Sequence, residues 1–140
     1  MNAPHTPPPP GDDAAANESP FKGKTGLRRV WNALHYSFAG LRAAHAHEDA
    51  FRQEIWLALL LTGTTLLLPV SGVERALMIA SVLLVLVVEL LNSAVEAAVD
   101  RVSLERHRLA KRAKDIGSAA VLLALVNVVV IWASIMLDRA

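Results

Sequence analysis

Residues 76–99 read A-L-M-I-A-S-V-L-L-V-L-V-V-E-L-L-N-S-A-V-E-A-A-V, and Glu89 and Glu96 are the only charged residues in this run of 24. A helix of roughly 20 apolar residues is long enough to cross the hydrocarbon core of a bilayer. The length and composition of this run therefore predict a transmembrane helix at about 75–100. Both of its acidic side chains lie in the second half of that helix.

Two further apolar runs lie on either side of this one along the chain. Residues 55–73 and 116–137 contain no charged residue over 19 and 22 positions, respectively. The alternative is a soluble bundle of three buried helices. Helices of soluble proteins carry a polar face, however, and the run at 116–137 has almost none. We therefore expect an all-α membrane protein with three transmembrane helices, at about 52–72, 75–100 and 115–137.

The composition supports this class and excludes several others. The chain has 140 residues, 54% of them hydrophobic and 19% charged, whereas ordinary soluble domains are about 45–50% apolar and about 25% charged. There is no cysteine, which excludes a disulfide framework and a thiolate metal site. Aromatic residues make up 5% of the chain, too few for a nucleic-acid stacking platform, so we expect no nucleic-acid partner.

The basic residues are distributed unevenly around the apolar runs. Of 14 Lys and Arg residues, twelve lie before the first run or between the second and third; only Arg75 and Arg139 lie elsewhere. Basic residues are enriched in the cytoplasmic segments of membrane proteins. We therefore expect the N-terminus and the second loop to be cytoplasmic, and the first loop and the C-terminus to face the other side of the membrane.

The N-terminal part of the chain divides into two segments of different character. Residues 1–24 are rich in proline and cannot bury a core, so we expect a disordered tail ahead of a membrane domain at 25–140. From about 25 to 47, apolar residues recur at helical spacing, which predicts an amphipathic helix on the cytoplasmic membrane surface. The alternative is a helix packed against a partner domain. The apolar positions are Leu27, Val30, Leu34, Phe38 and Leu41.

Glu89 and Glu96 need an explanation, because an acidic side chain near the middle of a membrane helix costs about 2.5 kcal/mol or more. At about 100° per residue, Glu89 shares one helix face with four other polar residues. These are Asn92, Ser93, Glu96 and Asp100. The resulting polar stripe runs along the cytoplasmic half of the second predicted span.

Other charged residues fall at the same membrane depth by the same charge rule. They are Glu48, Asp49, Arg52 and Glu54 before the first span, and Lys114 and Asp115 before the third. Carboxylates suit Mg²⁺, which binds through one or two acids plus substrate phosphates, and Lys and Arg suit phosphate. This combination is what phosphoryl transfer at a membrane surface requires.

The residue types alone leave other functions open. Glu89 and Glu96 could pair with basic residues of a neighbouring helix in a purely structural oligomer, or carry protons in a small transporter. The chain has no glycine-rich phosphate loop of the usual kinds. Binding of ATP would therefore use neither a Walker motif nor a protein-kinase motif.

Four segments together resemble the bacterial integral-membrane diacylglycerol kinase family. They are Y-S-F-A-G-L-R-A-A at 36–44, E-D-A-F-R-Q-E at 48–54, V-E-L-L-N-S-A-V-E-A-A-V-D-R at 88–101 and A-K-D-I-G-S-A-A-V at 113–121. The resemblance covers about residues 28–138. It implies a lipid kinase with three transmembrane helices and a surface helix, assembled as a homotrimer with active sites between subunits. It also implies a bacterial inner membrane, so that the C-terminus would be periplasmic.

The resemblance also implies roles for individual residues. Glu89 matches the catalytic base, Asn92 an active-site asparagine, and Glu48 and Glu96 the ligands of Mg²⁺. The positions that match nucleotide contacts are Arg29, Tyr36, Glu48, Glu96, Glu105, His107, Lys114 and Asp115. The positions that match contacts with the lipid substrate are Arg29, Ser37, Arg52, Gln53, Glu89 and Ser118.

The expected reaction is ATP- and Mg²⁺-dependent phosphorylation of diacylglycerol to phosphatidic acid, which recycles lipid by-products in phospholipid metabolism. Undecaprenol kinase is the alternative within the family. Polyprenol members tend to carry an arginine directly after the second glutamate, where this chain has Ala97. A proton-coupled transporter or a structural oligomer is the alternative from another class.

Overall fold

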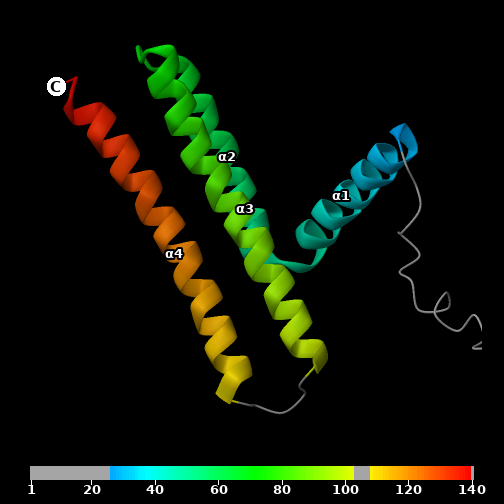
Figure 1. The fold of residues 1–140 in the computed structure, drawn as a ribbon. Helices are drawn as coiled ribbons and strands as arrows, with labels where there is room; N and C mark the ends of the chain where they lie inside the picture. The colour runs from blue at the N-terminus through cyan, green and yellow to red at the C-terminus, as the bar shows by residue number, and fades with distance from the viewer. Residues whose placement is uncertain (1–25, 103–107, 140) are drawn as a thin grey trace, which may run out of the picture. The chain divides into compact units, whose positions relative to one another are not determined.

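The computed structural model describes residues 26–102 and 108–139, and over these ranges the chain is helical with no strand (Figure 1). The helices are α1 (Leu27–His47), α2 (Asp49–Leu67), α3 (Gly72–Val102) and α4 (Arg108–Leu137). The all-α class expected from the sequence is therefore confirmed. The proline-rich segment at 1–24 lies outside the described residues.

The described residues divide into two units, which meet between residues 38 and 39. In the first unit, Gly26 has a φ of 78° and its carbonyl accepts a hydrogen bond from the Arg29 amide at 3.0 Å. A positive φ favours glycine, which has no Cβ to clash. The apolar face of the helix that follows is exposed, with Leu27 89% and Phe38 70% accessible.

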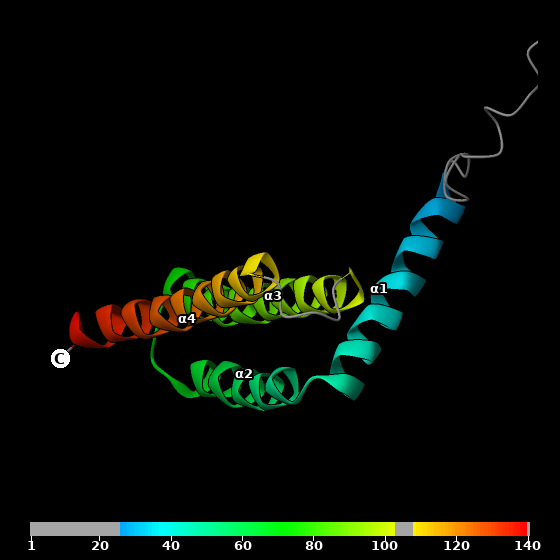
Figure 2. The same ribbon diagram turned by 90° about the horizontal axis from the view of Figure 1, so that it is seen from below.

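In the second unit, α3 packs against both α2 and α4 (Figures 1 and 2). Val70, Met78 and Ile135 form a small buried cluster near the α2–α3 connection, with Trp132 and Met136 packed against it. Most of the large apolar side chains elsewhere on the three helices are exposed. The outer surface of this unit is thus apolar, as expected for a surface that faces lipid or another subunit.

Two helices are long and apolar enough to cross a membrane. The most apolar 18-residue stretches within Gly72–Arg101 and Arg108–Leu137 have mean hydropathies of 2.3 and 2.6, and only 28% and 11% of these stretches are buried. A core helix of a soluble protein would be mostly buried. Among the described residues, α3 and α4 are therefore the two candidate membrane spans.

Helix α2 is shorter than the apolar run from which it forms. It ends at Leu67, because Leu68 precedes Pro69 and adopts an extended conformation, with φ −79° and ψ 140°. Proline disfavours the helical conformation in the residue before it. The uncharged helical part, 55–67, is about 20 Å long at about 1.5 Å per residue, which is less than the roughly 30 Å of a bilayer core.

Hydrogen bonds fix the end of the bundle where α2 leads into α3. Ser71 caps α3 by accepting from the Glu74 amide at 3.3 Å, and its own amide donates to Glu74 Oε2 at 2.6 Å. This reciprocal pair is a capping box. Arg139, beyond the end of α4, donates to Glu74 Oε2 at 2.5 Å and also to the Pro69 carbonyl. Arg139 thereby ties α4 to the α2–α3 connection.

Replacing Arg139 with glutamine is expected to lower the midpoint of thermal unfolding by a few degrees. Glutamine cannot form the two-pronged contact with Glu74, which stays partly buried at the start of α3. The measurement is thermal unfolding of the purified protein in detergent. Arg112→Gln on the exposed face of α4 is the matched control, and equal midpoints for the two variants would contradict this role.

Candidate active site

The polar stripe predicted on α3 lies on one uninterrupted helix, Gly72–Val102. Glu89 and Ser93 are buried, at 5% and 9% exposure. Asn92 and Glu96 are half-buried, and Asn92 Nδ2 donates to Glu96 Oε1 at 3.5 Å. Polar side chains one turn apart on a helix face one another, so the stripe forms a continuous row of polar groups.

Carboxylates from two helices gather around Glu89. Its side chain interacts electrostatically with Glu96 on α3 and with Glu48 just before α2. Glu48 is the N-cap residue of α2, yet its side chain makes no capping hydrogen bond. Glu54 of α2 also interacts with Glu89. Glu89 is thus the acid with which Glu48, Glu54 and Glu96 each interact, and we call these four side chains the acid cluster.

The acid cluster suits a hard cation that also binds phosphate. Within 26–102 and 108–139, no three or more acidic or histidine side chains lie close enough to hold a metal ion by themselves. Mg²⁺ does not require such a cage, because it commonly binds through one or two carboxylates together with the phosphates of its ligand. Glu48 and Glu96 have the donor chemistry for this mode of binding.

Lys114 brings a positive charge from α4 to the polar stripe. Its Nζ lies 2.7 Å from Asp100 Oδ1, and it also interacts electrostatically with Glu96. Lys114 is half-buried, whereas its neighbour Asp115 is exposed. A lysine beside a carboxylate row is placed to neutralise phosphate charge.

Arg52, Gln53 and Ser118, which were expected to contact the lipid substrate, make other contacts or are exposed. Arg52 donates to the carbonyls of His45 and Ala46, at 3.1 and 3.3 Å, and pairs with Asp49. Its guanidinium therefore holds the junction before α2. Gln53 and Ser118 are exposed.

Three other predicted residues belong to the first unit. Arg29 and Tyr36 are exposed, and the Tyr36 ring lies edge-on to His35 at 6.3 Å between centroids. The Ser37 hydroxyl donates to the Ala33 carbonyl at 2.9 Å. Glu105 and His107 lie outside the described residues.

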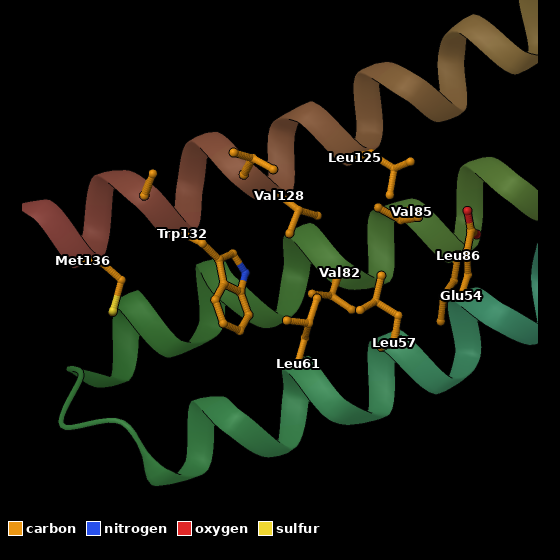
Figure 3. A pocket seen from close by; sticks show the side chains of 13 residues that line it. Glu54, Leu57, Leu61, Val82, Val85, Leu86, Leu125, Val128, Trp132 and Met136 are labelled. Carbon is orange, nitrogen blue, oxygen red and sulfur yellow. The ribbon is translucent and has the colours of Figure 1, made fainter.

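Sequence reasoning missed an apolar groove between α2, α3 and α4 (Figure 3). It has a volume of about 490 Å³, with Glu54 at one end and Trp132 and Met136 toward the other. The buried Oε2 of Glu54 has no hydrogen-bond partner among the described residues. Glu54 was visible in the sequence as one of the acids at 48–54, but its position beside Glu89 depends on how α2 packs against α3.

The chain matches the prokaryotic diacylglycerol kinase family over residues 35–136. A protein named diacylglycerol kinase from Pseudomonas aeruginosa is 60% identical, over 85% of this chain and 97% of its own length. Proteins of the same name from Escherichia coli K12 and Haemophilus influenzae are 51% and 50% identical, over 77% and 80% of this chain and 88% and 95% of their own lengths. The chain belongs to the prokaryotic diacylglycerol kinase family, which confirms the resemblance seen in the sequence.

Proposed function

We propose that this protein transfers the γ-phosphoryl group of ATP to the free hydroxyl of diacylglycerol, giving phosphatidic acid and ADP. The observation that carries the proposal is the acid cluster around buried Glu89, with Lys114 on the neighbouring helix. Phosphoryl transfer needs little covalent chemistry from the protein, because it depends on positioning and charge neutralisation. The names of the relatives supply the lipid substrate.

In this reaction Glu89 acts as the general base. The lipid hydroxyl oxygen attacks the γ-phosphorus, its proton passes to the Glu89 carboxylate, and the bond to the leaving ADP oxygen breaks. Glu89 is buried on α3, at the depth where the hydroxyl of a membrane lipid would reach it. Asn92, one turn further along α3, orients Glu96 and the phosphates.

Glu48 and Glu96 are proposed to hold Mg²⁺, which supplies neutralisation of the phosphate charge when bound. Lys114 neutralises the remaining phosphate charge from α4. Further nucleotide contacts are proposed for Arg29, Tyr36, Glu105, His107 and Asp115. Further lipid contacts are proposed for Arg29, Ser37, Arg52, Gln53 and Ser118.

The proposed setting is a bacterial inner membrane crossed by α3, by α4 and by the uncharged run 55–73, of which α2 forms the helical part, with α1 as a surface helix. The exposed apolar face of α1 and the uneven distribution of basic residues support this arrangement. It places the acid cluster on the cytoplasmic side, where ATP is available. A homotrimer with sites between subunits is proposed as well, since three thin helices cannot enclose both substrates.

The choice of lipid is tested by supplying Mg-ATP and either diacylglycerol or undecaprenol to the purified protein in mixed micelles. We expect phosphorylation of diacylglycerol to be the faster reaction, measured as kcat/KM for each lipid. Faster phosphorylation of undecaprenol would contradict the proposed substrate. ATP turnover that does not depend on either lipid would contradict lipid kinase activity altogether.

A further inference from the structure

Gly117 of α4 lies directly against the side chain of Asn92 on α3. A Cβ added at Gly117 would collide with Asn92 Oδ1 and lie 3.2 Å from Asn92 Cγ. The three heavy atoms nearest to that Cβ all belong to the Asn92 side chain. At Gly40, Gly63 and Gly72, by contrast, an added Cβ would meet no atom within 4 Å.

The Asn92 amide is held between this glycine and Glu96. Its Nδ2 donates to Glu96 Oε1 at 3.5 Å. Its Oδ1 is buried and has no hydrogen-bond partner among the described residues. An added Cβ takes the place of one of the two Cα hydrogens of Gly117. Because this Cβ would meet Asn92 Oδ1, the hydrogen that it replaces points toward Oδ1. Weak contacts between Cα–H groups and oxygen atoms recur at helix–helix interfaces.

We propose that Gly117 is a positioning residue for the active site: its missing side chain lets α4 set the orientation of Asn92, and through Asn92 that of Glu96. The inference rests on the proposed function, in which Asn92 and Glu96 act on the phosphates and Mg²⁺. Outer groups that orient a metal ligand commonly change metal affinity or activity by about 10–100-fold.

If Gly117 served only to let α3 and α4 pack closely, an added Cβ would push the two helices apart. The atoms that a Cβ meets are the end of a flexible side chain, so rotation of Asn92 relieves the clash and α3 and α4 need not separate. Alanine also favours the helix more than glycine does. Gly117→Ala should therefore keep the fold while disturbing the site.

The orientation of Asn92 is measured by NMR on protein labelled with ¹⁵N-asparagine, without metal or nucleotide. Asn92→Ala identifies the Asn92 side-chain amide resonance by its disappearance. We expect Gly117→Ala to shift that resonance and to leave the midpoint of thermal unfolding within a few degrees of the wild type. Gly63→Ala is the matched control, a helical glycine with open space around it, and should leave the resonance in place.

Kinetics then test the consequence for the site. We expect Gly117→Ala to raise the Mg²⁺ concentration for half-maximal turnover by about tenfold or more, with Gly63→Ala unchanged. An unshifted Asn92 resonance, wild-type kinetics, or a Gly117→Ala protein that no longer folds would each overturn the inference. A wild-type protein without lipid-dependent turnover would instead overturn the proposed function, while the NMR comparison would still decide whether Gly117 orients Asn92.

Discussion

Glu89→Gln lowers the rate of phosphoryl transfer to lipid by about 10²–10⁴-fold, the usual contribution of a positioned general base. Glutamine keeps the size of glutamate and its hydrogen-bonding capacity, but it cannot accept a proton from the lipid hydroxyl. The expected loss is in kcat, measured with saturating Mg-ATP and diacylglycerol in mixed micelles. Raising the Mg²⁺ concentration should restore none of it.

The fold of the Glu89→Gln protein should be intact. Removing a buried carboxylate from a cluster of like charges relieves repulsion with Glu48 and Glu96, so we expect an unfolding temperature at or above that of the wild type. Asp138→Asn, which removes an exposed acid just beyond α4, is the control and should keep full activity. Near-normal turnover by Glu89→Gln would rule out Glu89 as the base.

Glu96→Gln is expected to raise the Mg²⁺ concentration for half-maximal turnover by more than about tenfold, because it removes a proposed metal ligand. Turnover should recover in large part at high Mg²⁺, since Glu89 remains available as the base. The measurement is a Mg²⁺ titration of initial rates at fixed total ATP, corrected for free nucleotide.

The comparison of the two variants separates the two roles. A metal ligand changes the concentration dependence on Mg²⁺, whereas a base changes the maximal rate at any Mg²⁺ concentration. A second readout is the binding of Mn²⁺ in the presence of a non-hydrolysable ATP analogue, which Glu96→Gln should weaken and Glu89→Gln should not. If the two variants respond to Mg²⁺ in the same way, the assignment of Glu96 as a metal ligand is wrong.

The helical framework could be predicted from the sequence because its signals are local. The nearly uncharged run at 76–99 lies within α3, and the uncharged run at 116–137 lies within α4. The polar stripe followed from the helical period alone, and Asn92 and Glu96 do contact each other along α3. Such features require no knowledge of how the helices pack.

The end of α2 could not be predicted from the apolar composition of its run. The apolar run continues to residue 73, yet the helix ends at Leu67. The hydrophobicity of a run does not indicate its backbone conformation. Pro69 does, because proline disfavours the helical conformation in the residue before it. The proline was the local signal that the run divides into a helix and an extended connection.

Contacts between helices could not be read from one sequence. The position of Glu54 beside Glu89 depends on the packing of α2 on α3, and that of Gly117 against Asn92 depends on the packing of α3 on α4. Arg52 carries a charge suited to a lipid headgroup, yet its guanidinium hydrogen-bonds the backbone at His45 and Ala46. Side-chain partners of this kind are set by tertiary structure.

The most direct test of lipid kinase activity is the transfer of ³²P from labelled ATP to lipid by the purified full-length protein. In mixed micelles with Mg²⁺ and diacylglycerol, we predict labelled phosphatidic acid that forms in proportion to enzyme and disappears when either the lipid or Mg²⁺ is omitted. If an intact, folded protein produced no labelled lipid, the proposed lipid kinase activity would be wrong.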